Sequence, residues 1–172
     1  MKAVKANRRI YLIFGVVVAA ALLVLFVLPS IQAPIDNNGQ SGNTQSKQYY
    51  SKLMKFWMEV PQDFGVDDQG VSLVLSKGDK TIVVDRNGTN YESLDKYMAF
   101  FDSTRNLKVI ESEKVEIDNK EAFIRIEAFP NQSITEKSYF IYNNGVVYIF
   151  STQSESLYAD LDQIAQSFRY VP

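Results

Sequence analysis

The pattern of hydrophobic residues begins with one long apolar run near the N-terminus. Residues 10–28 read IYLIFGVVVAAALLVLFVL, which is 19 residues without a charge. As a helix with a rise of about 1.5 Å per residue, this run is about 28 Å long, close to the thickness of a bilayer's hydrocarbon core. A helix also satisfies its own backbone hydrogen bonds, as lipid requires. The run therefore predicts one transmembrane helix from Ile10 to Leu28.

The apolar pattern then disappears over residues 29–46. This segment reads PSIQAPIDNNGQSGNTQS, in which Pro, Gly, Asn and Ser dominate. Such a composition is typical of a flexible tether. We therefore divide the chain into a basic N-terminus (1–9), the transmembrane helix (10–28), a linker (29–46) and a folded domain (47–172).

Within the domain, short runs with a two-residue period alternate with turn residues, which predicts a series of strands. Alternate residues of one strand face opposite sides of a sheet, so Ile124 and Ile126 should lie on one side and Arg125 and Glu127 on the other. Turns are expected at Lys77-Gly78-Asp79, at Asp118-Asn119-Lys120 and at Asn144-Gly145, where the last pair suits a type I′ hairpin. The predicted strands are 55–60, 70–76, 80–85, 115–117, 122–129, 137–142 and 146–151.

Two segments instead have the period of a helix with one apolar face. The first runs from 91 to 103, and Thr89-x-x-Glu92 ahead of it can act as a capping box. The second runs from 155 to 168. The apolar faces are Leu94, Tyr97, Met98 and Phe101 in the first helix, and Leu157, Leu161, Ile164 and Phe168 in the second.

These elements together predict an α+β fold. Short turns between consecutive strands imply antiparallel pairing. Amphipathic helices need an apolar sheet surface to cover. We expect an antiparallel β-sheet flanked by amphipathic helices, preceded by one transmembrane helix.

Charge around the apolar run predicts the orientation of the chain in the membrane. Lys2, Lys5, Arg8 and Arg9 precede the run, and no basic residue follows it until Lys47. Positive flanks stay in the cytoplasm, which places the C-terminal domain outside. The alternative is a cleaved signal peptide, which also leaves the domain outside. We expect membrane lipid to be a partner through the N-terminal helix.

Composition excludes several classes of function. The chain has no Cys and no His, which removes thiolate and imidazole catalysis and the metal sites that depend on them. Residues 47–172 carry 14 Lys and Arg against 19 Asp and Glu, a net charge of −5, so nucleic acid is not an expected partner. No Walker or dinucleotide glycine pattern occurs. We predict no catalytic residue, no cofactor and no metal site.

Two short motifs give the domain a family resemblance. The opening Phe56-Trp57-Met58-Glu59-Val60-Pro61-Gln62-Asp63-Phe64 is similar to the aromatic strand, Pro and following aromatic of the PsbP/Mog1-like superfamily. The ending Ile164-Ala165-Gln166-Ser167-Phe168-Arg169-Tyr170 is similar to that family's last helix. Phe64 departs from the Trp found there in many members. The resemblance implies an α/β/α sandwich over about 47–172 and a non-catalytic accessory or protein-binding role.

A few residues merit individual attention. Asp67-Asp68 could bind a cation through oxygen ligands, although an acidic pair in a turn is usually solvated. Ser151, Ser154 and Ser156 precede the last helix, where capping is the expected role. Phe100 adjoins Phe101, and one helix face cannot readily bury both, so an exposed Phe100 becomes a candidate partner contact.

The leading functional interpretation is therefore a membrane-tethered, non-catalytic binding or assembly module with an unknown protein partner. One alternative is a small-molecule or lipid-binding module, which needs an apolar cavity between sheet and helix. Another is a Ser-Lys or carboxylate hydrolase, which needs a pocket holding those groups.

Overall fold

The computed structural model describes residues 45–130 and 132–172. The predicted transmembrane helix (10–28) and nearly all of the predicted linker lie outside the described residues. Within those two ranges, no helix is both long and apolar enough to span a bilayer.

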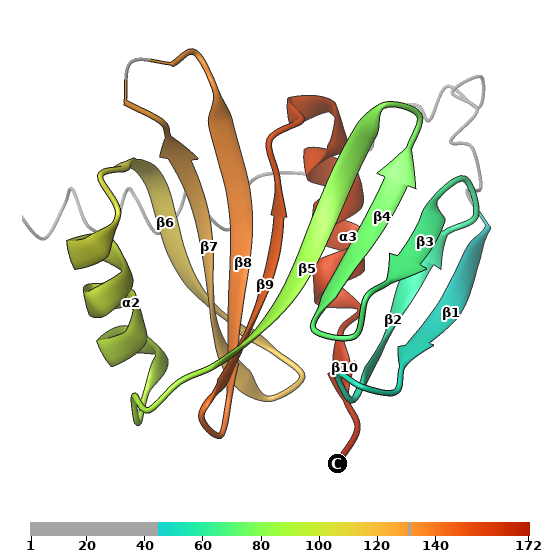
Figure 1. Cartoon of the computed structure of the whole chain (residues 1–172), viewed down its shortest axis with the longest axis horizontal. Helices are drawn as coiled ribbons and strands as arrows, with labels where there is room; N and C mark the ends of the chain where they lie inside the picture. The colour runs from blue at the N-terminus through green and yellow to red at the C-terminus, as the bar shows by residue number, and fades with distance from the viewer. Residues whose placement is uncertain (1–44, 131) are drawn as a thin grey trace, which may run out of the picture. The chain divides into compact units, whose positions relative to one another are not determined.

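The described chain is mostly β-strand, with two short α-helices (Figure 1). A single turn of 3₁₀ helix, η1, leads into the second of them. The elements in chain order are β1 (Ser46–Ser51), β2 (Phe56–Pro61), β3 (Gly65–Asp68), β4 (Ser72–Lys77), β5 (Lys80–Gly88), α2 (Leu94–Thr104), β6 (Lys108–Ile117), β7 (Lys120–Ala128), β8 (Thr135–Asn143), β9 (Val146–Thr152), η1 (Glu155–Leu157), α3 (Tyr158–Gln166) and β10 (Arg169–Tyr170).

The strands form two antiparallel sheets. A seven-stranded sheet has the order β3-β4-β5-β9-β8-β7-β6, and a three-stranded sheet has the order β1-β2-β10. Tight turns join β4 to β5, β6 to β7 and β8 to β9, at the three places expected from the sequence. The left-handed φ values of Asp118 (52°), Asn119 (55°), Asn144 (46°) and Gly145 (78°) explain why Asn, Asp and Gly occupy two of these turns.

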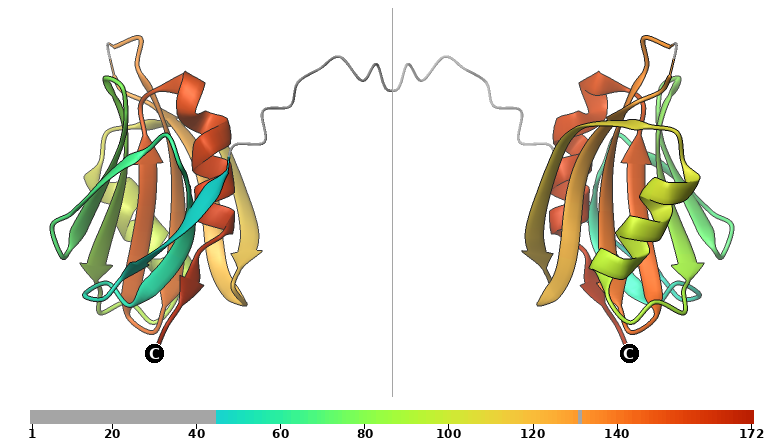
Figure 2. Two further views of the ribbon diagram at one scale, coloured as in Figure 1. Left: turned by 90° about the vertical axis from the view of Figure 1, so that its right-hand side faces the viewer. Right: turned by 90° about the vertical axis from the view of Figure 1, so that its left-hand side faces the viewer.

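The two helices lie on opposite sides of the seven-stranded sheet (Figure 2). On one side, Leu94 and Met98 of α2 pack against Phe140 and Val147. On the other side, α3 and the three-stranded sheet together enclose the main core. Alternate residues of β8 and β9 therefore pack into two different cores, one on each side of the sheet, as the strand period predicts.

Aromatic rings fill the main core between the sheet and α3. Phe168 is completely buried, and its ring centroid lies 5.2 Å from Phe56, 5.1 Å from Tyr148 and 5.9 Å from Phe150. Tyr148 also donates a hydrogen bond of 2.8 Å to the carbonyl of Met54. All four residues of the expected apolar face of the last helix are buried, although Leu157 and Phe168 lie just outside α3 itself.

The sequence pattern missed three edge strands, β1, β3 and β10, and most of a fourth, β6. β1 has one buried residue out of six, and β3 has four residues of which two are Asp, so neither shows apolar alternation. β6 begins at Lys108 and not at Val115. Its first seven residues are all exposed, so this part of the strand shows no apolar alternation, which explains the error.

Helix boundaries also differ from the prediction. α2 begins at Leu94, and its cap is Ser93, whose hydroxyl accepts from the backbone N–H of Lys96 at 3.4 Å. The expected capping box is therefore wrong, because Thr89 instead accepts from the N–H of Tyr91 in the preceding loop. The expected α/β/α sandwich is not clearly formed. The helices have only 11 and 9 residues, and α3 shares its side of the sheet with three further strands.

Candidate binding groove

A polar groove runs between β6, β7 and α3, on the α3 side of the sheet. Its volume is about 450 Å³. Ile124 and Ile126 of β7 form part of its floor, Glu111 and Glu113 of β6 lie along one side, and α3 forms the other. The register pairs Glu113 with Ile124 and Glu111 with Ile126, and directly opposed residues share one face of a sheet.

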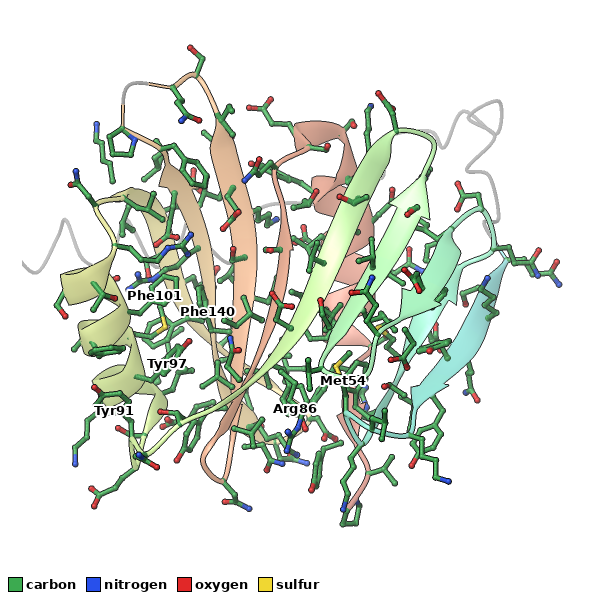
Figure 3. All side chains as sticks on the ribbon, viewed as in Figure 1. Met54, Arg86, Tyr91, Tyr97, Phe101 and Phe140 are labelled. Carbon is green, nitrogen blue, oxygen red and sulfur yellow. The ribbon has the colours of Figure 1, made fainter. Side chains whose placement is uncertain are left out.

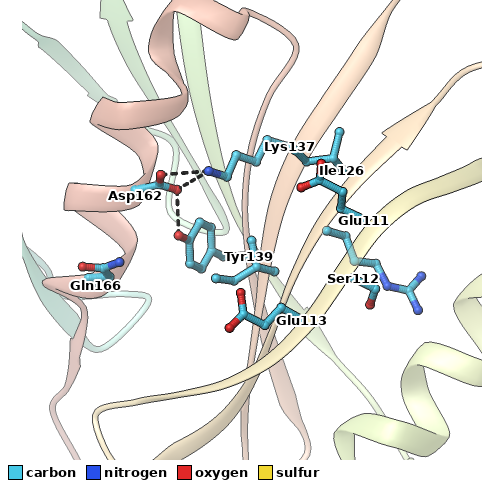
Figure 4. Close-up of a pocket in the computed structure, with 10 residues that line it drawn as sticks. Glu111, Ser112, Glu113, Ile126, Lys137, Tyr139, Asp162 and Gln166 are labelled. Carbon is cyan, nitrogen blue, oxygen red and sulfur yellow. Dashed lines mark hydrogen bonds and ion pairs between the residues drawn. The ribbon is translucent and has the colours of Figure 1, made fainter. Parts of the chain in front are cut away.

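The α3 side of the groove is held together by one carboxylate, Asp162 (Figure 4). Lys137 of β8 places its ammonium 2.6 Å from Asp162 Oδ1, and the hydroxyl of Tyr139 donates to the same oxygen at 2.7 Å. Burial and the neighbouring Asp162 raise the pKa of the Tyr139 hydroxyl, so it remains a donor at neutral pH. The negative charge of Asp162 is thus compensated by Lys137 and Tyr139.

Glu111 and Glu113 have a different environment. Both side chains are exposed, and neither forms an ion pair within residues 45–130 and 132–172. In Figure 4 no interaction joins either carboxylate to the other groove residues drawn. The β6 side of the groove therefore presents two uncompensated negative charges.

A second hollow of about 350 Å³ adjoins the groove, sharing Ile124, Tyr139 and Gln166 with it. Asp118, in the β6–β7 turn, closes this end. Its carboxylate accepts from Lys120 Nζ at 2.8 Å and from the backbone N–H of Tyr170 at 2.9 Å. Burial acts to raise the pKa of Asp118, but these hydrogen bonds outweigh it and lower that pKa. The turn is therefore tied to β10.

The other face of the sheet carries an aromatic cluster on and beside α2 (Figure 3). Phe101 points inward, with its ring centroid 5.0 Å from that of Phe140. Phe100 is 47% exposed and lies 5.3 Å from the ring of Tyr91, which precedes the helix. The helix therefore packs only one of the two neighbouring phenylalanines against the sheet, and Phe101 is half-buried there. The role of Phe100 as a partner contact stays a prediction.

Beneath the C-terminal end of α2 lies a buried charge cluster. Arg125 of β7 has a side chain only 8% exposed and forms a two-pronged ion pair with Asp102 of α2. The same guanidinium lies 3.3 Å from Glu127, whose side chain is 1% exposed. Burial raises the pKa of Glu127 despite the nearby arginine. This cluster holds the helix on the sheet, and Arg125 is also among the residues that line the groove.

Asp67 and Asp68 belong to no cluster of three or more metal-ligating side chains, and none occurs in the described part of the chain. Asp68 accepts from the hydroxyls of Tyr49 at 2.8 Å and Ser51 at 2.9 Å, which joins β3 to β1. It also accepts from the backbone N–H of Gly70 at 2.8 Å. Its role is therefore to connect the two sheets.

The serines before the last helix do not cap it. Ser154 occupies the N-cap position of η1 without a side-chain cap, so the capping expectation is wrong there. Ser156 accepts a 2.8 Å hydrogen bond from Lys80. A lysine that acts as a base needs burial away from water, whereas both of these side chains are exposed. The two side chains are within hydrogen-bond distance, as in a Ser-Lys dyad, but they are not shielded from water as a catalytic dyad requires.

Sequence reasoning did not single out the groove. Glu111 and Glu113 lie in the part of β6 that was not recognised as a strand. Asp162 and Gln166 are four residues apart in α3, a spacing that marks one helix face and could have indicated a polar wall. Lys137 and Tyr139 reach Asp162 only through the tertiary fold.

Comparison with known proteins identifies the fold of the chain but not an activity. No family model matches the chain, and no curated protein matches it. The chain is similar to the solution structure of cyanobacterial PsbP (CyanoP) from Synechocystis, with a TM-score of 0.55 and 15% identity over 80% of this chain and 99% of that one. It is also similar to a crystal structure from Bacteroides thetaiotaomicron, with a TM-score of 0.53 and 14% identity over 74% of this chain and 49% of that one. The described part therefore has a PsbP-like fold.

Proposed function

We propose that this chain is a membrane-tethered, non-catalytic binding or assembly module that acts outside the cytoplasm. The observation that carries the proposal is the open polar groove beside β6, whose two glutamates have no counter-charge among the described residues. Such a surface suits a macromolecular partner better than an enclosed ligand. The PsbP-like fold and the absence of Cys and His from the whole chain agree with a non-catalytic role.

The alternatives receive less support. The main core between sheet and α3 is filled by the rings of Phe56, Tyr148, Phe150 and Phe168, where a lipid-binding module would need an apolar cavity. A Ser-Lys hydrolase would need a buried pair, and the Lys80–Ser156 pair is exposed.

The binding role is testable by crosslinking in cells that make the full-length chain. A photo-reactive residue replaces Gln166, which is exposed and lines both hollows, and a matched control replaces Asp79 in the β4–β5 turn. We expect a discrete adduct from position 166 and none from 79. Identical adduct patterns from both positions, or no adduct from 166, contradict a binding role for the groove. A third probe at Phe100 tests the aromatic cluster in the same way.

Tethering requires its own experiment. The 19-residue apolar run and its basic flank predict that the full-length chain stays in the membrane pellet after alkaline extraction. A variant lacking residues 1–28 should be released. Protease added outside intact cells or spheroplasts should digest the domain. A full-length chain recovered as a soluble cytosolic protein contradicts the tether, and the mass of the mature chain distinguishes an anchor from a cleaved signal.

A further inference from the structure

Among the described residues, strand β6 is an edge of the seven-stranded sheet and pairs only with β7. It has ten residues, and its first seven are all exposed. An exposed edge of this length presents backbone N–H and C=O groups that can accept a further strand. Most proteins protect such an edge, and the register shift beside Val109 interrupts this one only near its start.

Charge on the groove face of β6 indicates what kind of strand fits. Glu111 and Glu113 lie two residues apart on that face and form no ion pair among the described residues. The opposite face carries both signs of charge: Lys114 pairs with Asp95 at 3.1 Å and with Glu121 at 3.6 Å, and Glu116 forms no ion pair among the described residues. An added strand would therefore meet two neighbouring unpaired glutamates on the groove face, but a lysine beside one unpaired glutamate on the other.

A second copy of this chain does not fit the edge. Two antiparallel β6 strands related by a twofold axis would share one continuous sheet, with the groove faces on the same side. In registers centred on residues 111–113, Glu111 and Glu113 of both copies would then face each other, and like charges across strands are destabilising. The predicted linker, residues 29–46, has no Lys or Arg to offer the glutamates.

We propose that β6 binds an extended segment of a partner protein by strand addition, and that this segment carries Lys or Arg at alternate positions. Residues two apart in a strand point to the same face, so two such cations would align with Glu111 and Glu113. Backbone hydrogen bonds to β6 supply affinity, and the cations select the face and register. This inference rests on the proposed binding function and names the chemistry of its partner.

The test uses the full-length protein in lipid nanodiscs and a fluorescent peptide that alternates Lys and Thr. We expect binding at physiological salt and a loss of about tenfold in affinity for the Glu111→Gln/Glu113→Gln variant, which corresponds to two weakened charge pairs. The control variant Asp79→Asn/Glu92→Gln removes the same total charge elsewhere and should stay within about twofold of wild type. Equal losses in both variants would mean general electrostatic attraction and overturn the proposal.

A second peptide separates strand addition from charge alone. It has the same sequence with N-methyl groups on alternate amides along one edge, which removes the donors that face β6. We expect this peptide to lose binding and a form methylated along the other edge to keep it, and unchanged affinity for both N-methylated forms would overturn the proposal. If the Lys-Thr peptide fails to bind while the probe at Gln166 still captures a partner, the cationic strand is wrong and the binding function stands.

Discussion

The ion pair between Arg125 and Asp102 allows a prediction about the Asp102→Ala variant. The effect of this substitution on the helix alone and its effect on the folded domain should change stability in opposite directions. Asp102 lies in the last turn of α2, where a negative charge opposes the helix dipole. Replacing it with Ala should therefore stabilise an isolated helix, by about 0.5–1 kcal/mol from charge and helix propensity together. The tertiary structure predicts the opposite result.

The tertiary cost follows from the burial of Arg125. Its side chain is 8% exposed and donates two hydrogen bonds to Asp102, which is itself 46% exposed. Hydrogen bonds to charged groups contribute about 1.5–3 kcal/mol each when buried, and water replaces part of that here because Asp102 is accessible. We take about 2–3 kcal/mol for the pair. The Asp102→Ala variant should therefore be destabilised by about 1–2.5 kcal/mol after the local gain is subtracted.

Urea unfolding of residues 43–172, followed by the fluorescence of Trp57, measures this difference, because Trp57 is the only tryptophan and lies in β2, outside α2. Glu92→Ala is the matched control, since its ion pair with Lys96 has side chains 83% and 60% exposed and should contribute less than about 0.5 kcal/mol. A stabilised or unchanged Asp102→Ala variant would refute the view that Arg125 holds α2 to the sheet.

Three further predictions concern stability. Phe168→Ala should cost about 3–5 kcal/mol, because the ring is fully buried among three others, and a loss below about 1 kcal/mol in urea unfolding would contradict that packing. Gly145→Ala should cost more than Gly78→Ala: both have left-handed φ (78° and 63°), but only the Cβ at 145 would meet the Thr89 carbonyl, at 3.2 Å. Equal thermal midpoints would contradict this. Burial raises the pKa of Glu127 above its ordinary value of 4.5, so the stability that this side chain contributes when protonated is lost as pH rises through the folded pKa. The Glu127→Gln variant should therefore gain stability relative to wild type as pH rises above 4.5. A difference that does not change with pH would argue against the shift.

The elements with strong local signals were predicted well. The Asn144-Gly145 turn and the turn at Asp118-Asn119 occur where the sequence placed them, because few residues other than Gly, Asn and Asp adopt positive φ readily. The apolar face of α2 is likewise confirmed by the burial of Leu94 and Met98. These features depend on neighbours within a few residues, which a single sequence displays directly.

The candidate contact at Phe100 shows an intermediate case. Helical period alone indicated that two adjacent phenylalanines could not both be buried. Only the structure shows that Phe101 packs on Phe140 while Phe100 stays 47% exposed beside Tyr91. The local pattern indicated that only one of the two rings packs on the sheet, and tertiary packing decides which one.

The sequence by itself determined the apolar run, its basic flank, the main hairpins and the amphipathic helices, because each depends on the order of residues along a short stretch. It could not determine the edge strands β1, β3 and β6, whose residues face water on one or both sides and so lack an apolar period, or the edge strand β10, which has only two residues. Nor could it determine the groove, where Asp162 meets Lys137 and Tyr139 across 25 and 23 positions of the chain. Such contacts form only when the sheet and α3 have packed together, since their energy comes from groups that are distant along the chain and adjacent only in the folded state.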